Sequence, residues 1–139
     1  MVELPMTSPV EKLMSKKVVT VDVSSSVFDA TREIMDRDIG CVVVLKENKV
    51  VGIVTKGDIL RETVMKRLDA QQLNIERTMT RPVLTIEPTS TLAEASNLMS
   101  QENLTKLPVV TKSGELVGII TSTDIVRRNQ PTKIARDMI

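Results

Sequence analysis

Gly52-Ile53-Val54-Thr55-Lys56-Gly57-Asp58-Ile59 and Gly118-Ile119-Ile120-Thr121-Ser122-Thr123-Asp124-Ile125 are two copies of one pattern, Gly-Ile-x-Thr-x-x-Asp-Ile. The repetition extends well outside the pattern, because Met14 aligns with Met79 and Thr20 with Thr85 at an offset of 65 residues. An extra residue near Ser113-Gly114 moves the offset to 66 within the pattern itself. A repeat at a fixed spacing indicates that one structural unit is written twice.

The first copy predicts five elements in order. The β-branched run Val18–Val21 predicts a strand. Ser26-x-x-Asp29 is a capping box, which predicts a helix with its apolar face toward the core. A hairpin follows, with strands at 41–45 and 49–54 and a turn at Glu47-Asn48, and a closing helix begins near Lys56. The order is therefore β-α-β-β-α.

The second copy predicts the same order from equivalent signals. These are a strand at Val83–Ile86, a capping box at Thr91-x-x-Glu94, a hairpin of strands 107–110 and 115–120, and a closing helix near Ser122. The charged segment 62–74 joins the copies, and we expect it to continue the first closing helix.

A sheet covered by helices on one face does not bury its other face well in about 55 residues. We therefore expect an α+β fold in which two pseudo-symmetric units pack sheet to sheet. The predicted domains are residues 8–67, residues 68–130 and a helical tail at 131–139. The tail is expected because Ile134-x-x-x-Met138 repeats the spacing of Val10-x-x-x-Met14.

The amino-acid composition argues against several classes of function. Of 139 residues, 19 are Lys or Arg and 18 are Asp or Glu, so the net charge of +1 gives no general attraction to nucleic acid or membrane. The chain has no His and one Cys, which argues against an enzyme and a zinc site. Cys41–Leu45 is the longest apolar run and is too short to span a membrane. With no visible secretory signal and a lone cysteine, we expect a cytoplasmic protein.

The doubled pattern, together with Val27-x-x-Ala30 and Leu107-Pro108-Val109, resembles tandem CBS domains, regulatory modules named after cystathionine β-synthase. The resemblance covers residues 8–129. It implies a ligand sensor without a catalytic cofactor, which binds AMP, ADP, ATP, NAD(H) or S-adenosylmethionine in a cleft between the two units. Other members of the family bind no known ligand.

The resemblance also implies two pockets, each assembled from both copies. In one pocket, Asp124 accepts hydrogen bonds from the ribose hydroxyls, and Thr121 and Thr123 face the phosphates. The opposite wall of this pocket comprises Thr20, Val23, Ser25, Ile39, Gly40 and Cys41. The other pocket places Asp58, Thr55 and Lys56 against Thr85, Pro88, Ser90, Leu104, Thr105 and Lys106. Aliphatic side chains, Ile53 and Ile119 among them, hold the adenine.

The chemistry of these residues suits such a ligand. A carboxylate has two acceptor oxygens for a vicinal diol, and the start of a helix favours phosphate. The two pockets are unequal because Lys106 stands where the first copy has Cys41. We therefore expect Asp124 to matter more for binding than Asp58.

Other interpretations stay open at this point. Thr-x-x-Asp before a helix is also an ordinary capping box, so the chain is equally consistent with a ligand-free dimerisation or protein-interaction module. Phe28 aligns with Ala93 and is either a core residue or a dimer contact. We expect a homodimer that passes its ligand state to a regulated protein. Nucleic-acid binding has only Arg127-Arg128 and nearby basic residues in its favour.

Overall fold

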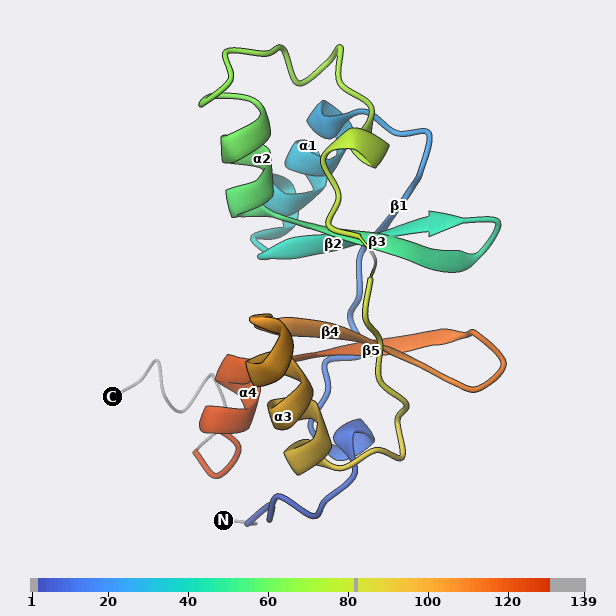
Figure 1. Cartoon of the computed structure of the whole chain (residues 1–139), viewed down its shortest axis with the longest axis vertical. Helices are drawn as coiled ribbons and strands as arrows, with labels where there is room; N and C mark the ends of the chain where they lie inside the picture. The colour runs from blue at the N-terminus through green and yellow to red at the C-terminus, as the bar shows by residue number, and fades with distance from the viewer. Residues whose placement is uncertain (1–2, 82, 131–139) are drawn as a thin grey trace. The chain divides into compact units, whose positions relative to one another are not determined.

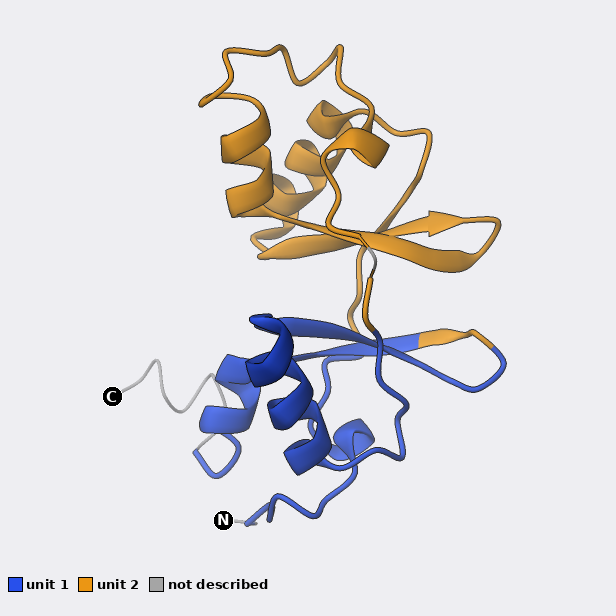
Figure 2. Cartoon of the chain, in the orientation of Figure 1, with its two compact units in different colours: residues 1–16, 85–113, 117–139 blue, residues 17–84, 114–116 orange. Residues whose placement is uncertain are grey.

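The computed structural model describes residues 3–81 and 83–130 and shows a mixture of helices and strands (Figure 1). The predicted α+β class is confirmed. The chain forms two compact units (Figure 2). The α1–α2 unit contains residues 17–84 and 114–116, and the α3–α4 unit contains the remaining described residues.

The α1–α2 unit has a three-stranded sheet in the order β1-β2-β3. Its strands are β1 (Thr20–Asp22), β2 (Cys41–Lys46) and β3 (Lys49–Thr55), with β1 parallel and β3 antiparallel to β2. Helices α1 (Val27–Arg37) and α2 (Lys56–Glu62) cover one face of the sheet (Figure 1). The core between sheet and helices consists of Val27, Ala30, Ile34, Val42, Val44, Val54, Ile59, Ile75 and Met79.

Local chemistry explains where these elements begin and turn. The Ser26 side chain accepts a hydrogen bond from the Asp29 N–H, and Asp29 Oδ2 accepts one from the Ser26 N–H, so the predicted capping box at the start of α1 is confirmed. Glu47 and Asn48 have positive φ of 50° and 66°. This left-handed pair makes the two-residue turn that the hairpin requires.

The α3–α4 unit contains α3 (Leu92–Glu102), β4 (Lys106–Val110), β5 (Leu116–Thr121) and α4 (Ser122–Val126). Its sheet has two strands, so the predicted strand Val83–Ile86 is wrong except at Ile86, which bridges to Val109. In the first repeat, the Val43 N–H donates to Val19 and the Val23 N–H donates to Leu45.

The equivalent positions in the second repeat are Pro108 and Pro88. Proline has no backbone N–H, so both hydrogen bonds that would extend this strand are missing. Two residue identities therefore account for the difference between the sheets.

The segment after α2 corrects a second expectation. The helix ends at Glu62 rather than continuing to residue 74, and Arg67, in the segment that follows, adopts a left-handed φ of 57°, which a regular helix does not allow. Residues 63–73 form turns up to η2 (Ile75–Arg77).

Each unit also contains a pre-strand segment from the other repeat. Met14 lies against Gly118, where a Cβ atom would be 2.5 Å from its Sδ atom, and Met79 lies against Gly52, where the corresponding distance is 2.4 Å. Ser15 bridges to Ile119 on the same segment, which begins with η1 (Val10–Lys12). Residues before Lys16 thus pack with the second repeat and residues 68–84 with the first.

The compact units therefore cut across the sequence repeats. The ranges 8–67 and 68–130 stay predictions of the repeat boundaries, and the predicted tail at 131–139 lies outside the described residues.

Candidate ligand site

Both Thr-x-x-Asp patterns open a short helix as capping boxes. The Thr55 N–H donates to Asp58 Oδ2 at 2.9 Å, and the Asp58 N–H donates to Thr55 Oγ1 at 3.2 Å. The corresponding distances at Thr121 and Asp124 are 3.2 Å and 3.1 Å. The capping interpretation is thus confirmed for both copies, and any ligand role of the carboxylates comes in addition to it.

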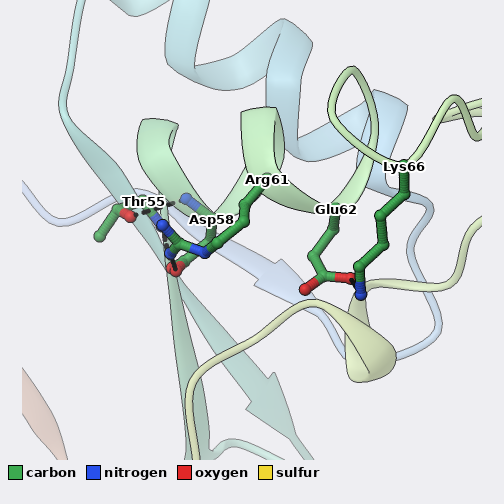
Figure 3. A network of polar contacts seen from close by, with 5 residues as sticks. All are labelled: Thr55, Asp58, Arg61, Glu62 and Lys66. Carbon is green, nitrogen blue, oxygen red and sulfur yellow. Dashed lines mark hydrogen bonds and ion pairs between the residues drawn. The ribbon is translucent and has the colours of Figure 1, made fainter.

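The two carboxylates differ in what else they bind. Arg61 Nη2 lies 2.8 Å from Asp58 Oδ1, and the Asp58 side chain is only 13% exposed (Figure 3). Both Asp58 oxygens therefore have a partner. Within residues 3–81 and 83–130, Asp124 has a hydrogen-bond partner only at Oδ2.

The lengths of the helices explain this difference. Arg61 lies inside α2, one turn after Asp58, which places its side chain beside the carboxylate. Arg127, its counterpart, is the C-cap of the shorter α4, with φ −97° and ψ 13°. Asp124 therefore retains one oxygen that is available for a further donor.

In the α1–α2 unit, the start of α2 lies beside the residues that precede β2. The Lys56 N–H donates to the Gly40 carbonyl at 3.3 Å, and Cys41 pairs with Thr55 in the antiparallel register. Ile39 packs against the core of the same unit. The structure thus brings Gly40 and Cys41 to Thr55 and Lys56.

Alternation along the strands places several predicted residues on the sheet face opposite the helices. Thr20 pairs with Val43, which pairs with Ile53, while their neighbours Val42, Val44 and Val54 face the helical core. Ile53 is buried and Thr20 is exposed. On this face an exposed hydroxyl therefore lies next to buried apolar side chains.

The α3–α4 unit repeats the arrangement with different side chains. The Ser122 N–H donates to the Thr105 carbonyl at 2.9 Å, so Leu104–Lys106 lie beside Thr121–Asp124. Thr123 is exposed, and Lys106 and Thr121 are half-buried. Where the first unit has Lys56 at the helix start, this unit has the hydroxyl of Ser122.

The predicted residues before each first helix lie in turns. Ser25 and Ser90 use their carbonyls to accept the N–H groups of Ile75 and Val10, which fixes both turns to a pre-strand segment. Ser24 donates hydrogen bonds to Asp22, and these lower the pKa of that carboxyl. Val23, Thr85 and Pro88 belong to the same two segments, with Thr85 exposed.

Within each unit, the start of the closing helix lies beside the residues that open the hairpin. Asp58 lies beside Gly40 and Cys41 in one unit, and Asp124 lies beside Thr105 and Lys106 in the other. This grouping could have been predicted from the hairpin in the sequence. A two-residue turn at 47–48 places the end of β3 beside the start of β2. The pairing of residues from both copies stays a prediction.

Among the described residues, no cluster of three or more His, Cys, Asp and Glu side chains is arranged to hold a metal ion. Within the same part of the chain, no helix has the length and apolar character needed to cross a membrane.

The CBS domain family model matches residues 10–64 and 74–130. The chain belongs to the CBS domain family. Both matches contain one Gly-Ile-x-Thr-x-x-Asp-Ile pattern, so the capping boxes described above are the CBS elements of this chain. The family resemblance seen in the sequence is confirmed.

Similar proteins include enzymes and separate CBS pairs. Inosine-5'-monophosphate dehydrogenase from Korarchaeum cryptofilum is 32% identical over 127 residues, which are 91% of this chain and 25% of that protein. The chain thus spans about a quarter of that relative. A conserved protein from Pyrococcus horikoshii has a similar structure, with 31% identity, a TM-score of 0.82 and coverage of 93% of this chain and 97% of that one.

A second similar structure contains ligands. The CBS domain pair of protein MJ0100, in complex with 5'-methylthioadenosine and S-adenosyl-L-methionine, is 30% identical, with a TM-score of 0.79. The similarity covers 89% of this chain and 96% of that one. A related CBS pair therefore binds adenosine-containing ligands.

Proposed function

We propose that this CBS pair is a regulatory sensor that binds an adenosine-containing ligand and passes its state to a partner protein. Candidate ligands are AMP, ADP, ATP, NAD(H) and S-adenosylmethionine, and 5'-methylthioadenosine joins them because of the MJ0100 complex. In this proposal Asp124 binds the ribose, and Thr121, Thr123 and Lys106 lie close to it.

The choice of Asp124 rather than Asp58 as the ribose-binding residue rests on one observation. Among the described residues, the Asp124 carboxylate accepts the Thr121 N–H at Oδ2 and has no partner at Oδ1, whereas both oxygens of Asp58 are engaged. A ribose diol at Asp124 gains a charge-assisted hydrogen bond without breaking an ion pair. At Asp58 the same ligand competes with Arg61.

Isothermal titration calorimetry with the six ligands tests the proposal. Asp124→Asn keeps an oxygen that can accept the Thr121 N–H but removes the charge, and a hydrogen bond to a charged group contributes about 1.5–3 kcal/mol. We expect the dissociation constant to rise at least tenfold. Asp58→Asn is the matched control, with an expected rise of less than threefold. Equal losses in the two variants contradict the preference for Asp124, and no heat from any ligand at millimolar concentration contradicts the sensor itself.

The second candidate is a ligand-free interaction module. It is favoured by the capping boxes, which account for both patterns without a ligand, and by exposed apolar side chains on α1 and α2. This module predicts a melting temperature that no nucleotide changes, whereas a ligand that binds only the folded state raises it. In either case we propose that two copies associate.

A further inference from the structure

Residues 4–8 contact the start of α3 and the end of α4. At the start of α3, the N–H groups of Leu92 and Ala93 donate to the Ser8 and Met6 carbonyls, each at 2.9 Å. Leu92 and Ala93 are the first two residues of the helix, so their N–H groups have no partner inside it. We call residues 4–8 the strap, and it belongs to the same compact unit as both helices (Figure 2).

Two side chains fasten the strap to the end of α4. Asn129 Oδ1 accepts a hydrogen bond from the Leu4 N–H at 2.7 Å, and Arg128 Nε donates one to the Leu4 carbonyl at 2.9 Å. Arg128 Nη1 also donates to the Ile125 carbonyl at 2.9 Å, inside α4. Both residues are half-buried, whereas the neighbouring Arg127 is exposed. Arg128 and Asn129 thus join α4 to the strap, and we call this pair the clasp.

The first repeat makes the equivalent connection with the chain itself. The first two N–H groups of α1 donate to the carbonyls of Leu73 and Ala70, as those of α3 donate to the strap. Residues 63–69 link these carbonyls covalently to the end of α2. In the α3–α4 unit, Leu4 and Asn129 are 125 positions apart in the sequence, so the connection between strap and helix end is non-covalent.

The strap lies outside the buried core of its unit. Leu4, Met6 and Ser8 are half-buried, and the residues between them are exposed. Val10, which follows the strap, is completely buried and anchors the segment. A segment with little buried apolar surface can open locally while the core stays folded. The strength of the clasp therefore sets how often the strap opens.

Closure of the strap also affects the helix that carries Asp124. α4 has five residues, and a helix of this length is not stable without contacts at its ends. The Thr121 capping box fixes its first turn, and the Arg128 guanidinium binds the Ile125 carbonyl in its last turn. Opening of the clasp removes the second of these contacts and loosens the turn on which the Asp124 carboxylate lies.

We infer that the strap opens and closes as a unit, that Arg128 and Asn129 are the clasp that holds it closed, and that closure positions Asp124. The positioning of Asp124 rests on the proposed ligand function, whereas the opening of the strap does not. A ligand that binds Asp124 better in the closed state favours closure, and closure favours binding by the same factor.

Hydrogen-exchange NMR of two matched variants tests the opening. Arg128→Gln removes the charged donor of the clasp, and Arg127→Gln makes the same change at the exposed neighbour. We expect the amides of Leu4, Leu92 and Ala93 to exchange together, about tenfold faster in Arg128→Gln and at the wild-type rate in Arg127→Gln. The first two amides of α1 should be unchanged in both variants, because a covalent link holds their partners.

The exchange experiment has clear contrary outcomes. If the three amides exchange as slowly as the core amides of wild type, the segment opens only on global unfolding, and the strap is overturned. Equal exchange rates in the two variants overturn the clasp. If circular dichroism shows that Arg128→Gln is unfolded, Asn129→Ala replaces it, with Asn129→Asp as the control that keeps an acceptor for the Leu4 N–H. Equal rates in that pair also overturn the clasp.

Isothermal titration calorimetry with the six ligands tests the positioning of Asp124. We expect the dissociation constant to rise about fivefold in Arg128→Gln and to stay unchanged in Arg127→Gln. In an Asp124→Asn background, Arg128→Gln should have less than about a twofold effect, because Arg128 acts through Asp124.

The calorimetry also separates this inference from the proposed function. An unchanged affinity in Arg128→Gln overturns the positioning, and so does the same loss in both backgrounds, since a general loss of structure would weaken binding whether or not Asp124 is present. No heat from any ligand overturns the proposed function and the positioning with it. The strap and its clasp are then decided by hydrogen exchange alone.

Discussion

Thr78 carries a buried hydroxyl that has no hydrogen-bond partner in the described part of the chain. Its counterpart in the other repeat is Leu13, so the position does not require a polar side chain. Burial without a partner costs free energy, because the hydroxyl loses its bonds to water.

Thr78→Val should therefore stabilise the protein by about 1 kcal/mol, or about 3 °C in melting temperature. Thr63→Val is the control, since the buried Thr63 hydroxyl donates to the Ile59 carbonyl at 2.6 Å. That change should destabilise the protein by ~1 kcal/mol. Denaturant unfolding measures both, and a loss of stability in Thr78→Val contradicts the description of this hydroxyl.

At the scale of elements, two prolines decide that one sheet has three strands and the other two. Val43 donates to Val19 in the first repeat, and Pro108 has no N–H to donate to Leu84 in the second. Pro108→Val supplies this donor without changing the apolar character of the strand.

We expect the new amide at position 108 to exchange slowly with solvent in hydrogen-exchange NMR, with a protection similar to that of the Val43 amide. Overall stability should change by less than about 1 kcal/mol, because the added hydrogen bond is offset by the greater freedom of the unfolded chain. An amide at position 108 that exchanges as fast as an exposed loop contradicts the explanation.

At the scale of the whole molecule, each segment that precedes the first strand of one repeat packs on the other repeat. This packing predicts which pairs of mutations have non-additive effects on the free energy of unfolding. A Cβ atom at Gly52 would lie 2.4 Å from the Sδ atom of Met79, so Gly52→Ala should destabilise the protein by about 1–3 kcal/mol. Met79→Ala relieves that clash, and the two changes should be coupled by at least ~0.5 kcal/mol.

The control pairs Gly52→Ala with Met14→Ala, which should be additive within about 0.5 kcal/mol because Met14 lies against Gly118 instead. Free energies of unfolding for the single and double variants complete both cycles. Coupling to Met14 and additivity with Met79 would show that each segment packs on the opposite repeat from the one described.

The sequence by itself determined the repeat, both hairpins and the starts of the four α-helices in the described part of the chain. These features depend on neighbours along the chain, since Ser26, Thr55, Thr91 and Thr121 cap helices whose first turns they directly precede. It also identified the family, because the two patterns at matched spacing are the segments that the CBS model matches.

Only the tertiary structure decided which partners these local elements acquire. Met14 and Met79 have equivalent sequence contexts, and their contacts with Gly118 and Gly52 depend on the path of the chain between them. Likewise, Asp58 and Asp124 have the same local pattern, but within residues 3–81 and 83–130 the length of the following helix gives an arginine partner to Asp58 and not to Asp124. A capping box is fixed within four residues, whereas packing and ion pairing depend on where each helix ends and what lies against it.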